Sequence, residues 1–266
     1  MAPIASSGMG FWGNVTSTID WCEKNYDTTY YIAEFWNTIS NIFLIIPPVF
    51  SIIRSMTKST DIVLLICCAQ LIAVGIGSWL FHMTLKYHMQ LLDELPMLYA
   101  SSFSTYVLTK IAFPPFKKSF ALKIGLTFYA LLVTILYLTI KHPLLFQLSY
   151  LVLIFVIVAL DIYISKHKRC NPKLFYCSAF LYCTGAVTWT IDNLFCENLH
   201  QFRQVMPQFL IPLTQTHAIW HCLAAYGAYC HAYFCTQSKA LEERKNVRLS
   251  WDWIGLKLLY DESKLK

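Results

Sequence analysis

The sequence predicts an all-α, polytopic membrane protein with seven transmembrane helices. Two observations lead to this fold class. Of the 266 residues, 56% are hydrophobic and only 14% are charged, whereas an ordinary soluble domain carries roughly 25% charged residues. The chain also contains seven apolar runs of about the 20 residues that a helix needs to cross a bilayer. Its basic residues form no stripe interleaved with aromatic residues, so the sequence does not favour nucleic-acid binding.

The seven expected helices differ in how clearly they are marked. The first contains Asn37, Asn41, Pro47 and Pro48, so a kink is expected there. The third is interrupted by Asp93 and Pro96 and is the least apolar. A further run, Trp251–Leu259, is too short to span the membrane and is compatible with an interfacial amphipathic segment. The expected spans are Ile32–Ile53, Ile62–His82, Met89–Leu108, Phe120–Ile140, Pro143–Ile164, Leu174–Ile191 and Pro212–Phe234.

The distribution of basic residues predicts the orientation. Alternate loops and the tail are rich in Lys and Arg, and the other loops carry only Lys86, Lys141 and Arg203. By the positive-inside rule, the C-terminus is cytosolic and the N-terminus is lumenal or extracellular. We therefore expect a lumenal segment (residues 1–31), a transmembrane domain (32–235) and a cytosolic tail (236–266). The residues counted as cytosolic are Arg54, Lys58, Lys110, Lys117, Lys118, Lys166, Lys168, Arg169, Lys173, Lys239, Arg244, Lys245 and Arg248.

Three histidines are candidate metal ligands. His217 and His221 are four residues apart, so they project from one helical face about 5–6 Å apart. His82 ends another apolar run, and the expected topology brings all three to one membrane depth. Three histidines with an open fourth position are a recurring ligand set for catalytic zinc. The alternative is a group of interfacial histidines bonded to backbone or water, with His88 and His200 as possible substitutes in a metal site.

Ser78 and Asp93 are candidate catalytic residues beside these histidines. Ser78 lies four residues before His82, on the same helical face. Its hydroxyl would stabilise a developing oxyanion or bond back to its own helix. Asp93 would act as an acid and base, or orient a metal-bound histidine. The alternative for Asp93 is a loop acid at the membrane surface.

Two features mark the non-cytosolic side. The segment Asp20-Trp-Cys-Glu-Lys-Asn-Tyr-Asp27, followed by Glu34, is rich in the oxygen ligands that calcium prefers. Its spacing is not that of an EF-hand, and composition alone favours an ordinary polar segment. Cys22 and Cys196 are the cysteines expected outside the spans on this oxidising side, so a disulfide between them is expected.

Longer blocks of sequence carry a family resemblance. Between Trp12 and Tyr233 the chain resembles the alkaline ceramidases. The blocks that carry the resemblance are Ser17-Thr-x-Asp-Trp-Cys-Glu23, Tyr31-Ile-Ala-Glu-Phe-Trp-Asn37, Gly77-Ser-Trp-x-Phe-His-Met-Thr-Leu-Lys-Tyr87, Met89-Gln-Leu-Leu-Asp-Glu-Leu-Pro-Met97, Ile191-Asp-Asn-x-Phe-Cys-Glu197 and Thr216-His-Ala-x-Trp-His221.

The resemblance implies a seven-helix enzyme of the endoplasmic reticulum or Golgi membrane that hydrolyses the amide of ceramide to a sphingoid base and a fatty acid. It implies that the acidic segment is a calcium site, contrary to the interpretation from composition alone. The implied residues are the zinc ligands His82, His217 and His221, with Ser78 and Asp93 beside them; the calcium ligands Asp20, Trp21 through its carbonyl, Glu23, Asn25 and Glu34; and the disulfide Cys22–Cys196.

Two other classes of protein remain open from the sequence. A zinc-containing seven-helix receptor of the progestin and adiponectin receptor type has a similar arrangement, but with the opposite orientation in the membrane. A structural or transport protein would use the histidines only to line a cavity. A cytosolic N-terminus would favour the receptor, and absence of zinc from the purified protein would favour the structural or transport protein.

Overall fold

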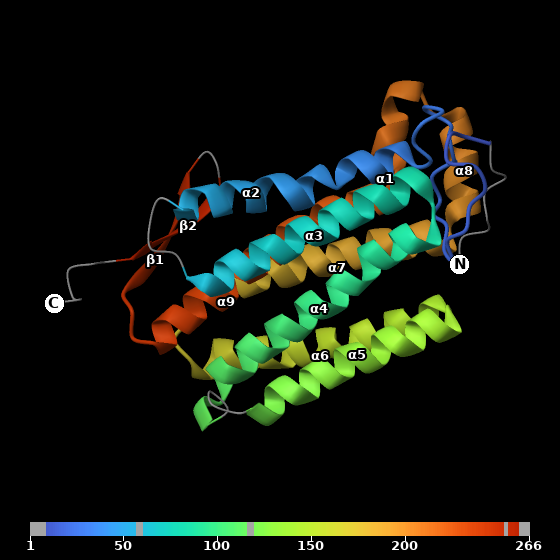
Figure 1. Cartoon of the computed structure of the whole chain (residues 1–266). Helices are drawn as coiled ribbons and strands as arrows, with labels where there is room; N and C mark the ends of the chain where they lie inside the picture. Colours follow the sequence, from blue (N-terminus) through green and yellow to red (C-terminus); the bar gives the residue numbers. More distant parts are fainter. Residues whose placement is uncertain (1–8, 57–60, 116–119, 253–254, 261–266) are drawn as a thin grey trace. The chain divides into compact units, whose positions relative to one another are not determined.

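The chain is predominantly α-helical, as predicted (Figure 1). The structure is a computed structural model that describes residues 9–56, 61–115, 120–252 and 255–260. The loop residues Lys58, Lys117 and Lys118 lie outside the described residues. The elements are α1 (Phe35–Ser40), α2 (Ile42–Met56), α3 (Ile62–Thr84), α4 (Tyr87–Ala112), α5 (Phe120–Ile140), α6 (Pro143–His167), α7 (Pro172–Leu194), α8 (Cys196–Val205), the 3₁₀ helix η2 (Gln208–Thr214), α9 (Thr216–Glu242), β1 (Val247–Asp252) and β2 (Gly255–Tyr260).

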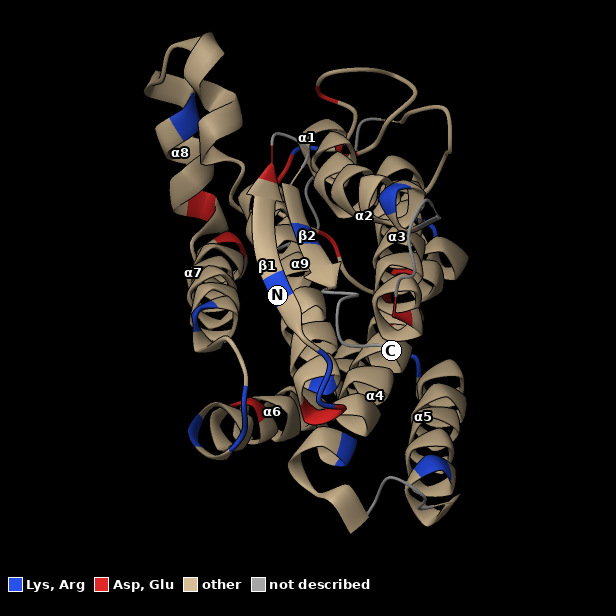
Figure 2. Cartoon of the chain, turned by 90° about the vertical axis from the view of Figure 1, so that its left-hand side faces the viewer, with Lys and Arg blue, Asp and Glu red and all other residues tan. Residues whose placement is uncertain are grey.

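Each expected span coincides largely with helix, and most of the ribbon carries no charged residue (Figure 2). In the part of the chain that the structure describes, five segments are long and apolar enough to cross a membrane. The helices α4 and α9 have 26 and 27 residues, but they are more polar. The chain is therefore a multi-pass helical membrane protein. The five segments are Phe35–Ser55, Ile62–Thr84, Phe120–Ile140, Pro143–His167 and Pro172–Leu194.

The first span is interrupted earlier than its prolines. Pro47 and Pro48 lie inside α2, whereas α1 ends and α2 begins around Asn41. The Asn41 side-chain amide donates to the Asn37 carbonyl at 2.9 Å, which is the kind of local bond that competes with regular helix. The kink at the prolines stays a prediction.

The C-terminal run differs from the expectation. The described residues of Trp251–Leu259, expected as an interfacial amphipathic segment, lie in two antiparallel strands in which Val247 pairs with Tyr260 and Asp252 with Gly255. Apolar residues alternate with polar ones along β1, which is the period of a strand. The all-α expectation therefore fails at this hairpin.

The described residues form two compact units. The first unit comprises the described parts of residues 1–46, together with 72–94 and 179–227. It contains every candidate site residue. Its core includes a buried cluster formed by Trp21, Ala33, Phe81 and Leu85.

Backbone hydrogen bonds join the N-terminal segment to the end of α3. The N–H groups of Thr16 and Ser17 donate to the Leu85 carbonyl, each at 3.1 Å, and the Glu34 N–H donates to the His82 carbonyl at 3.0 Å. The last carbonyls of a helix lack partners within the helix. The N-terminal segment supplies those partners, which brings residues 16–34 against the helix end that carries His82.

The second unit comprises the described parts of residues 47–71, 95–178 and 228–266. Here His231 pairs with Asp161, with 3.0 Å between the imidazole Nε2 and a carboxylate oxygen. The Arg54 guanidinium donates to the Asp252 carboxylate at 2.9 Å, which ties α2 to the hairpin. His231 and Arg54 thus each have a charged partner within this unit.

Candidate metal centre

Three histidines converge in the first unit, as the sequence predicted. His82 lies in the last turn of α3, and His217 and His221 lie in the first two turns of α9. One ligand nitrogen from each lies within 4.8 Å of those of the other two. All three side chains are buried. Burial of three imidazoles at this separation is expensive unless each nitrogen has a partner.

Hydrogen bonds assign the proton positions of two of these rings. The Nδ1 of His82 bonds to the Glu34 carboxylate, which accepts and never donates when ionised. The Nδ1 of His221 lies 2.8 Å from Ser40 Oγ and 3.1 Å from the Asn37 carbonyl, and that carbonyl can only accept. With the proton on Nδ1, each ring presents the Nε2 lone pair, and an Nδ1–H bonded to carboxylate or carbonyl is typical of histidines that bind metals.

His217 is fixed by stacking and by its backbone. Its ring lies 3.6 Å from the Trp21 ring, centroid to centroid, at an interplanar angle of 18°. Its N–H donates to the Asp192 carboxylate at 3.2 Å. Both His217 Nδ1 and His82 Nε2 are buried without a hydrogen-bond partner among the described residues.

The histidine cluster fits a zinc ion. It offers three imidazole nitrogens as ligands, which is the donor set of many catalytic zinc sites. Two of its buried nitrogens also lack a hydrogen-bond partner among the described residues. The alternative ligands named from the sequence lie elsewhere. His88 is exposed, and His200 Nε2 lies 2.8 Å from the Cys22 carbonyl oxygen.

Ser78 and Asp93 face each other between α3 and α4. The Ser78 hydroxyl lies within hydrogen-bonding reach of the Asp93 carboxylate, and Ser78 is buried. The close approach of the two helices depends on Gly77, because a Cβ there would overlap the Leu92 carbonyl oxygen. Asp93 thus has a defined partner on the helix that carries His82.

We expect Gly77→Ala to destabilise the protein by about 1–3 kcal/mol, because an added methyl group would force two backbones apart. The thermal midpoint of the purified protein in detergent should fall. Gly125→Ala is the matched control, because a Cβ there meets no atom within 4 Å. It should leave the midpoint unchanged or raise it slightly. An unchanged midpoint in Gly77→Ala would contradict the close packing.

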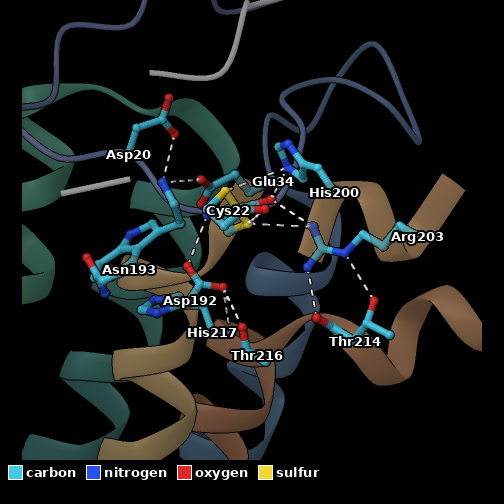
Figure 3. The surroundings of a disulfide bond; sticks show 12 residues. Asp20, Cys22, Glu34, Asp192, Asn193, His200, Arg203, Thr214, Thr216 and His217 are labelled. Carbon is cyan, nitrogen blue, oxygen red and sulfur yellow. Dashed lines mark hydrogen bonds between the residues drawn. A yellow bond between two sulfur atoms is a disulfide. The ribbon is translucent and has the colours of Figure 1, made fainter. Parts of the chain in front are cut away.

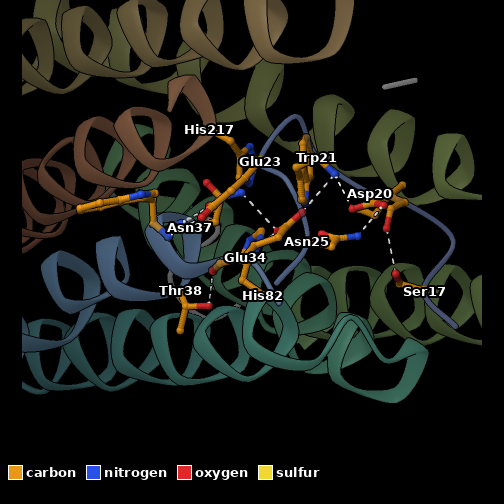
Figure 4. Close-up of polar contacts among 12 residues, drawn as sticks. Ser17, Asp20, Trp21, Glu23, Asn25, Glu34, Asn37, Thr38, His82 and His217 are labelled. Carbon is orange, nitrogen blue, oxygen red and sulfur yellow. Dashed lines mark hydrogen bonds and ion pairs between the residues drawn. The ribbon is translucent and has the colours of Figure 1, made fainter. Parts of the chain in front are cut away.

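The residues of the expected calcium site form a buried cluster (Figure 4). The Trp21 N–H donates to Asp20 at 2.9 Å and to Glu34 at 3.2 Å. The Asn25 amide donates to Asp20 at 3.2 Å, while its Oδ1 is buried without a hydrogen-bond partner among the described residues. Glu23 accepts from two N–H groups at the start of α1.

This cluster fits a hard cation. Burial raises the pKa of Asp20 and raises the pKa of Glu23 to about 7. The fully buried carboxyl of Glu34 lies beside them. A divalent cation would remove this electrostatic cost, and calcium prefers carboxylate and amide oxygens. The composition-based interpretation of an ordinary polar segment therefore does not account for the burial of these groups.

Glu34 contacts both candidate metal sites. One carboxylate oxygen accepts from the Trp21 N–H, and the other contacts His82 Nδ1 and the Asn37 amide. Its side chain is fully buried. Trp21 adds a second connection because its ring stacks on His217. The acidic cluster and the histidine cluster thus share side chains, so a change in one is expected to alter the other.

A disulfide joins Cys22 to Cys196, as expected (Figure 3). It links the N-terminal segment to α8, and Leu199 packs against it. Its sulfurs are therefore not available as thiolate ligands, although they lie close to His200. The disulfide holds the acidic segment against the helices that follow α7.

Asp192 and Arg203 have positioning roles that the sequence reasoning did not assign. Asp192 accepts from the Cys22 N–H at 3.0 Å and the Thr216 hydroxyl at 2.8 Å, as well as from the His217 N–H. Arg203 donates to the Cys22 carbonyl at 2.8 Å and to Thr214 (Figure 3). An acid at the end of an apolar run was the available signal for Asp192.

Comparison with known proteins places the chain in one family. A model of the ceramidase family matches residues 13–259. Alkaline ceramidase 3 of Mus musculus is 41% identical over 252 residues, which cover 94% of each chain. Alkaline ceramidase YPC1 of Saccharomyces cerevisiae is 32% identical over 271 residues, covering 93% of this chain and 85% of the yeast protein. Alkaline ceramidase 1 of Homo sapiens is 28% identical over 259 residues, covering 91% of this chain and 92% of the human protein.

Proposed function

We propose that this chain, which belongs to the ceramidase family, is a zinc-dependent intramembrane hydrolase that cleaves ceramides to a sphingoid base and a free fatty acid. The observation that carries the proposal is the buried cluster of His82, His217 and His221. The family match supplies the substrate class, and the cluster supplies a site for the chemistry. The relatives described above carry ceramidase names, so the receptor alternative is not favoured.

The proposal includes seven transmembrane helices. Both α4 and α9 exceed the length needed to cross about 30 Å of hydrocarbon at 1.5 Å per residue. The Cys22–Cys196 bond supports a lumenal N-terminus, because disulfides form in oxidising compartments. Residues 1–31 then form a lumenal segment with the calcium site, residues 32–235 the catalytic domain, and residues 236–266 a cytosolic tail. We place the enzyme in the endoplasmic reticulum or Golgi membrane.

His82, His217 and His221 would hold the zinc ion. When bound, zinc supplies Lewis-acid polarisation of the amide carbonyl and lowers the pKa of a coordinated water to about 7. Glu34 and Ser40 orient the rings of His82 and His221 through their Nδ1 atoms. Because the cluster is buried, bulk water is excluded and the charges that develop in the reaction interact strongly.

Asp93 would transfer the protons, and Ser78 would stabilise the oxyanion. The Asp93 carboxylate takes a proton from the attacking water as its oxygen bonds to the amide carbon. Asp93 then gives that proton to the amide nitrogen as the C–N bond breaks, which releases the sphingoid base. Ser78 lies next to Asp93. Its hydroxyl donates a hydrogen bond to the carbonyl oxygen as negative charge develops there.

Asp20, Glu23, Asn25, Glu34 and the Trp21 carbonyl would hold a calcium ion. Its role is structural, because neutralising the buried carboxylates stabilises the segment that carries Trp21 and Glu34. Through these two residues the calcium site supports the positions of His217 and His82. Calcium is therefore expected to raise activity without entering the reaction.

We expect Glu34→Gln to lower hydrolysis by about 10–100-fold, the usual cost of losing an outer partner of a metal-bound histidine. Activation by calcium should disappear, while zinc stays bound because all three histidines remain. Activity and zinc content are measured across a calcium titration. Glu197→Gln, a change at an exposed glutamate of α8, is the control and should behave as wild type. Wild-type calcium dependence in Glu34→Gln would count against the calcium site.

The decisive experiment incubates the purified protein with a panel of ceramides and measures the released sphingoid base. Release should stop after treatment with a zinc chelator and return when zinc is added. An active preparation that contains no transition metal would overturn the zinc proposal. An inert preparation that contains zinc would overturn the proposed hydrolysis.

A further inference from the structure

An apolar pocket of about 400 Å³ lies in the first unit. This volume is within the range of small-molecule sites, roughly 300–1,000 Å³. Residues of α1, the start of α2, η2 and the first turns of α9 line it. The side chains that matter for the argument are Ile39, Ser40, Ile42, Phe43, Ile219 and Cys222.

The pocket shares a wall with the histidine cluster. Ser40 lines the pocket, and its hydroxyl oxygen lies 2.8 Å from His221 Nδ1. Cys222, also in the lining, directly follows His221 in α9. Ser40 therefore links the lining of the pocket to one of the candidate zinc ligands, His221.

The pocket communicates with the outside of the unit along α2. Ile42 and Phe43 line it and are 41% and 38% exposed. Both belong to the candidate membrane span Phe35–Ser55. In the proposed membrane arrangement the pocket therefore opens toward hydrocarbon, and a lipid chain would enter it without passing through water.

Two polar contacts hold its walls in place. Glu23 accepts from the Trp36 N–H at 2.7 Å and from the Asn37 N–H at 2.8 Å, which fixes the start of α1. Arg203 donates to the carbonyl and hydroxyl oxygens of Thr214, which fixes the end of η2. The pocket is therefore formed by anchored elements and is not a gap between loose side chains.

We propose that this pocket is the subsite for the acyl chain of the ceramide, an inference that rests on the proposed function. In a ceramide the acyl chain begins at the reacting carbonyl carbon, whereas the sphingoid base carries hydroxyl groups close to the amide. Those hydroxyls need polar partners. Ser40 is the hydroxyl-bearing residue in the described lining, and it is already bonded to His221 and to the Asn37 carbonyl. Trp36 adds an indole N–H, which can donate but cannot accept the proton of a hydroxyl. The lining thus suits the chain without hydroxyls.

The test compares kcat/KM for ceramides with a long and a short acyl chain on one sphingoid base. Ile219→Trp fills the pocket and should lower the long-to-short ratio by about tenfold or more. Phe43→Ala removes apolar contact and should lower it severalfold. Ile135→Trp places the same ring on an exposed face of α5 and should leave the ratio unchanged. The ratio does not depend on the fraction of enzyme that is folded or loaded with zinc.

A second series varies the sphingoid chain at fixed acyl chain, and its ratio should not change in either pocket variant. A change confined to this second series would overturn the assignment to the acyl chain. Unchanged ratios in both series for Phe43→Ala and Ile219→Trp would overturn the subsite, even while wild type remains active. If wild type releases no sphingoid base from any ceramide, it is the proposed function that fails.

Discussion

His217→Ala should abolish zinc binding and ceramide hydrolysis together. His217 supplies one of three nitrogen ligands, and its removal leaves two histidines, fewer than the three protein ligands of a typical catalytic zinc site. The loss of hydrolysis should exceed the roughly 100-fold that follows when only an outer partner of a ligand is removed. Zinc is measured by elemental analysis of purified protein, and activity by release of the sphingoid base.

His88→Ala is the matched control for this variant. His88 is an exposed residue near the start of α4, so the change removes an imidazole of the same unit without touching the cluster. This control should retain both zinc and activity. The ligand assignment would be wrong if purified His217→Ala kept both. Loss of activity with full zinc content would instead assign His217 a role other than binding the metal.

The convergence of the histidines was predictable because it follows from topology. His82 ends one apolar run, and His217 and His221 begin another, so the predicted alternation of seven spans would bring them to the same side of the membrane. The i, i+4 spacing then places two of them on one helical face. The structure adds burial and the contacts that orient the rings, both of which are consistent with that prediction.

The supporting contacts could not be read from the sequence, because they join residues far apart in the chain. Ser40 lies 181 positions from His221, and Cys22 lies 170 positions from Asp192. Neither spacing nor periodicity indicates such a pair. The acidic segment presents the same difficulty, since composition alone favoured an ordinary polar segment, and the burial of Asp20 and Glu34 is visible only in the structure.

The C-terminal hairpin was missed for a different physical reason. Its apolar run is short, and a short run fits a strand as well as part of an amphipathic helix. Pairing of Val247 with Tyr260 decides between them, and pairing between strands is a tertiary property. The sequence marked Asn41 as one of several residues compatible with a kink in the first span, and the structure adds the side-chain bond from Asn41 to the Asn37 carbonyl at the place where α1 ends.

Asp93→Asn should lower kcat for ceramide by about 10²–10⁴-fold, the usual contribution of a general acid and base. The amide keeps the shape of the carboxyl group and its ability to accept from Ser78, but it cannot take a proton from water. Zinc content and KM should change little, because Asp93 is not among the histidine ligands. The pH dependence of kcat should also lose the limb that reports the catalytic carboxylate.

The neighbouring acid provides the control that separates proton transfer from a general effect of charge. Glu94 is buried and accepts from the Gln90 amide at 3.1 Å. One residue along a helix turns the side chain by roughly 100°, so Glu94 and Asp93 face different directions. Glu94→Gln removes one negative charge at almost the same depth and should retain most of kcat and the full pH profile.

Equal losses in the two variants would mean that local charge matters and that Asp93 does not transfer the proton. A near wild-type Asp93→Asn would return Asp93 to the simpler interpretation, an acid at the membrane surface, and would require another base beside the histidine cluster.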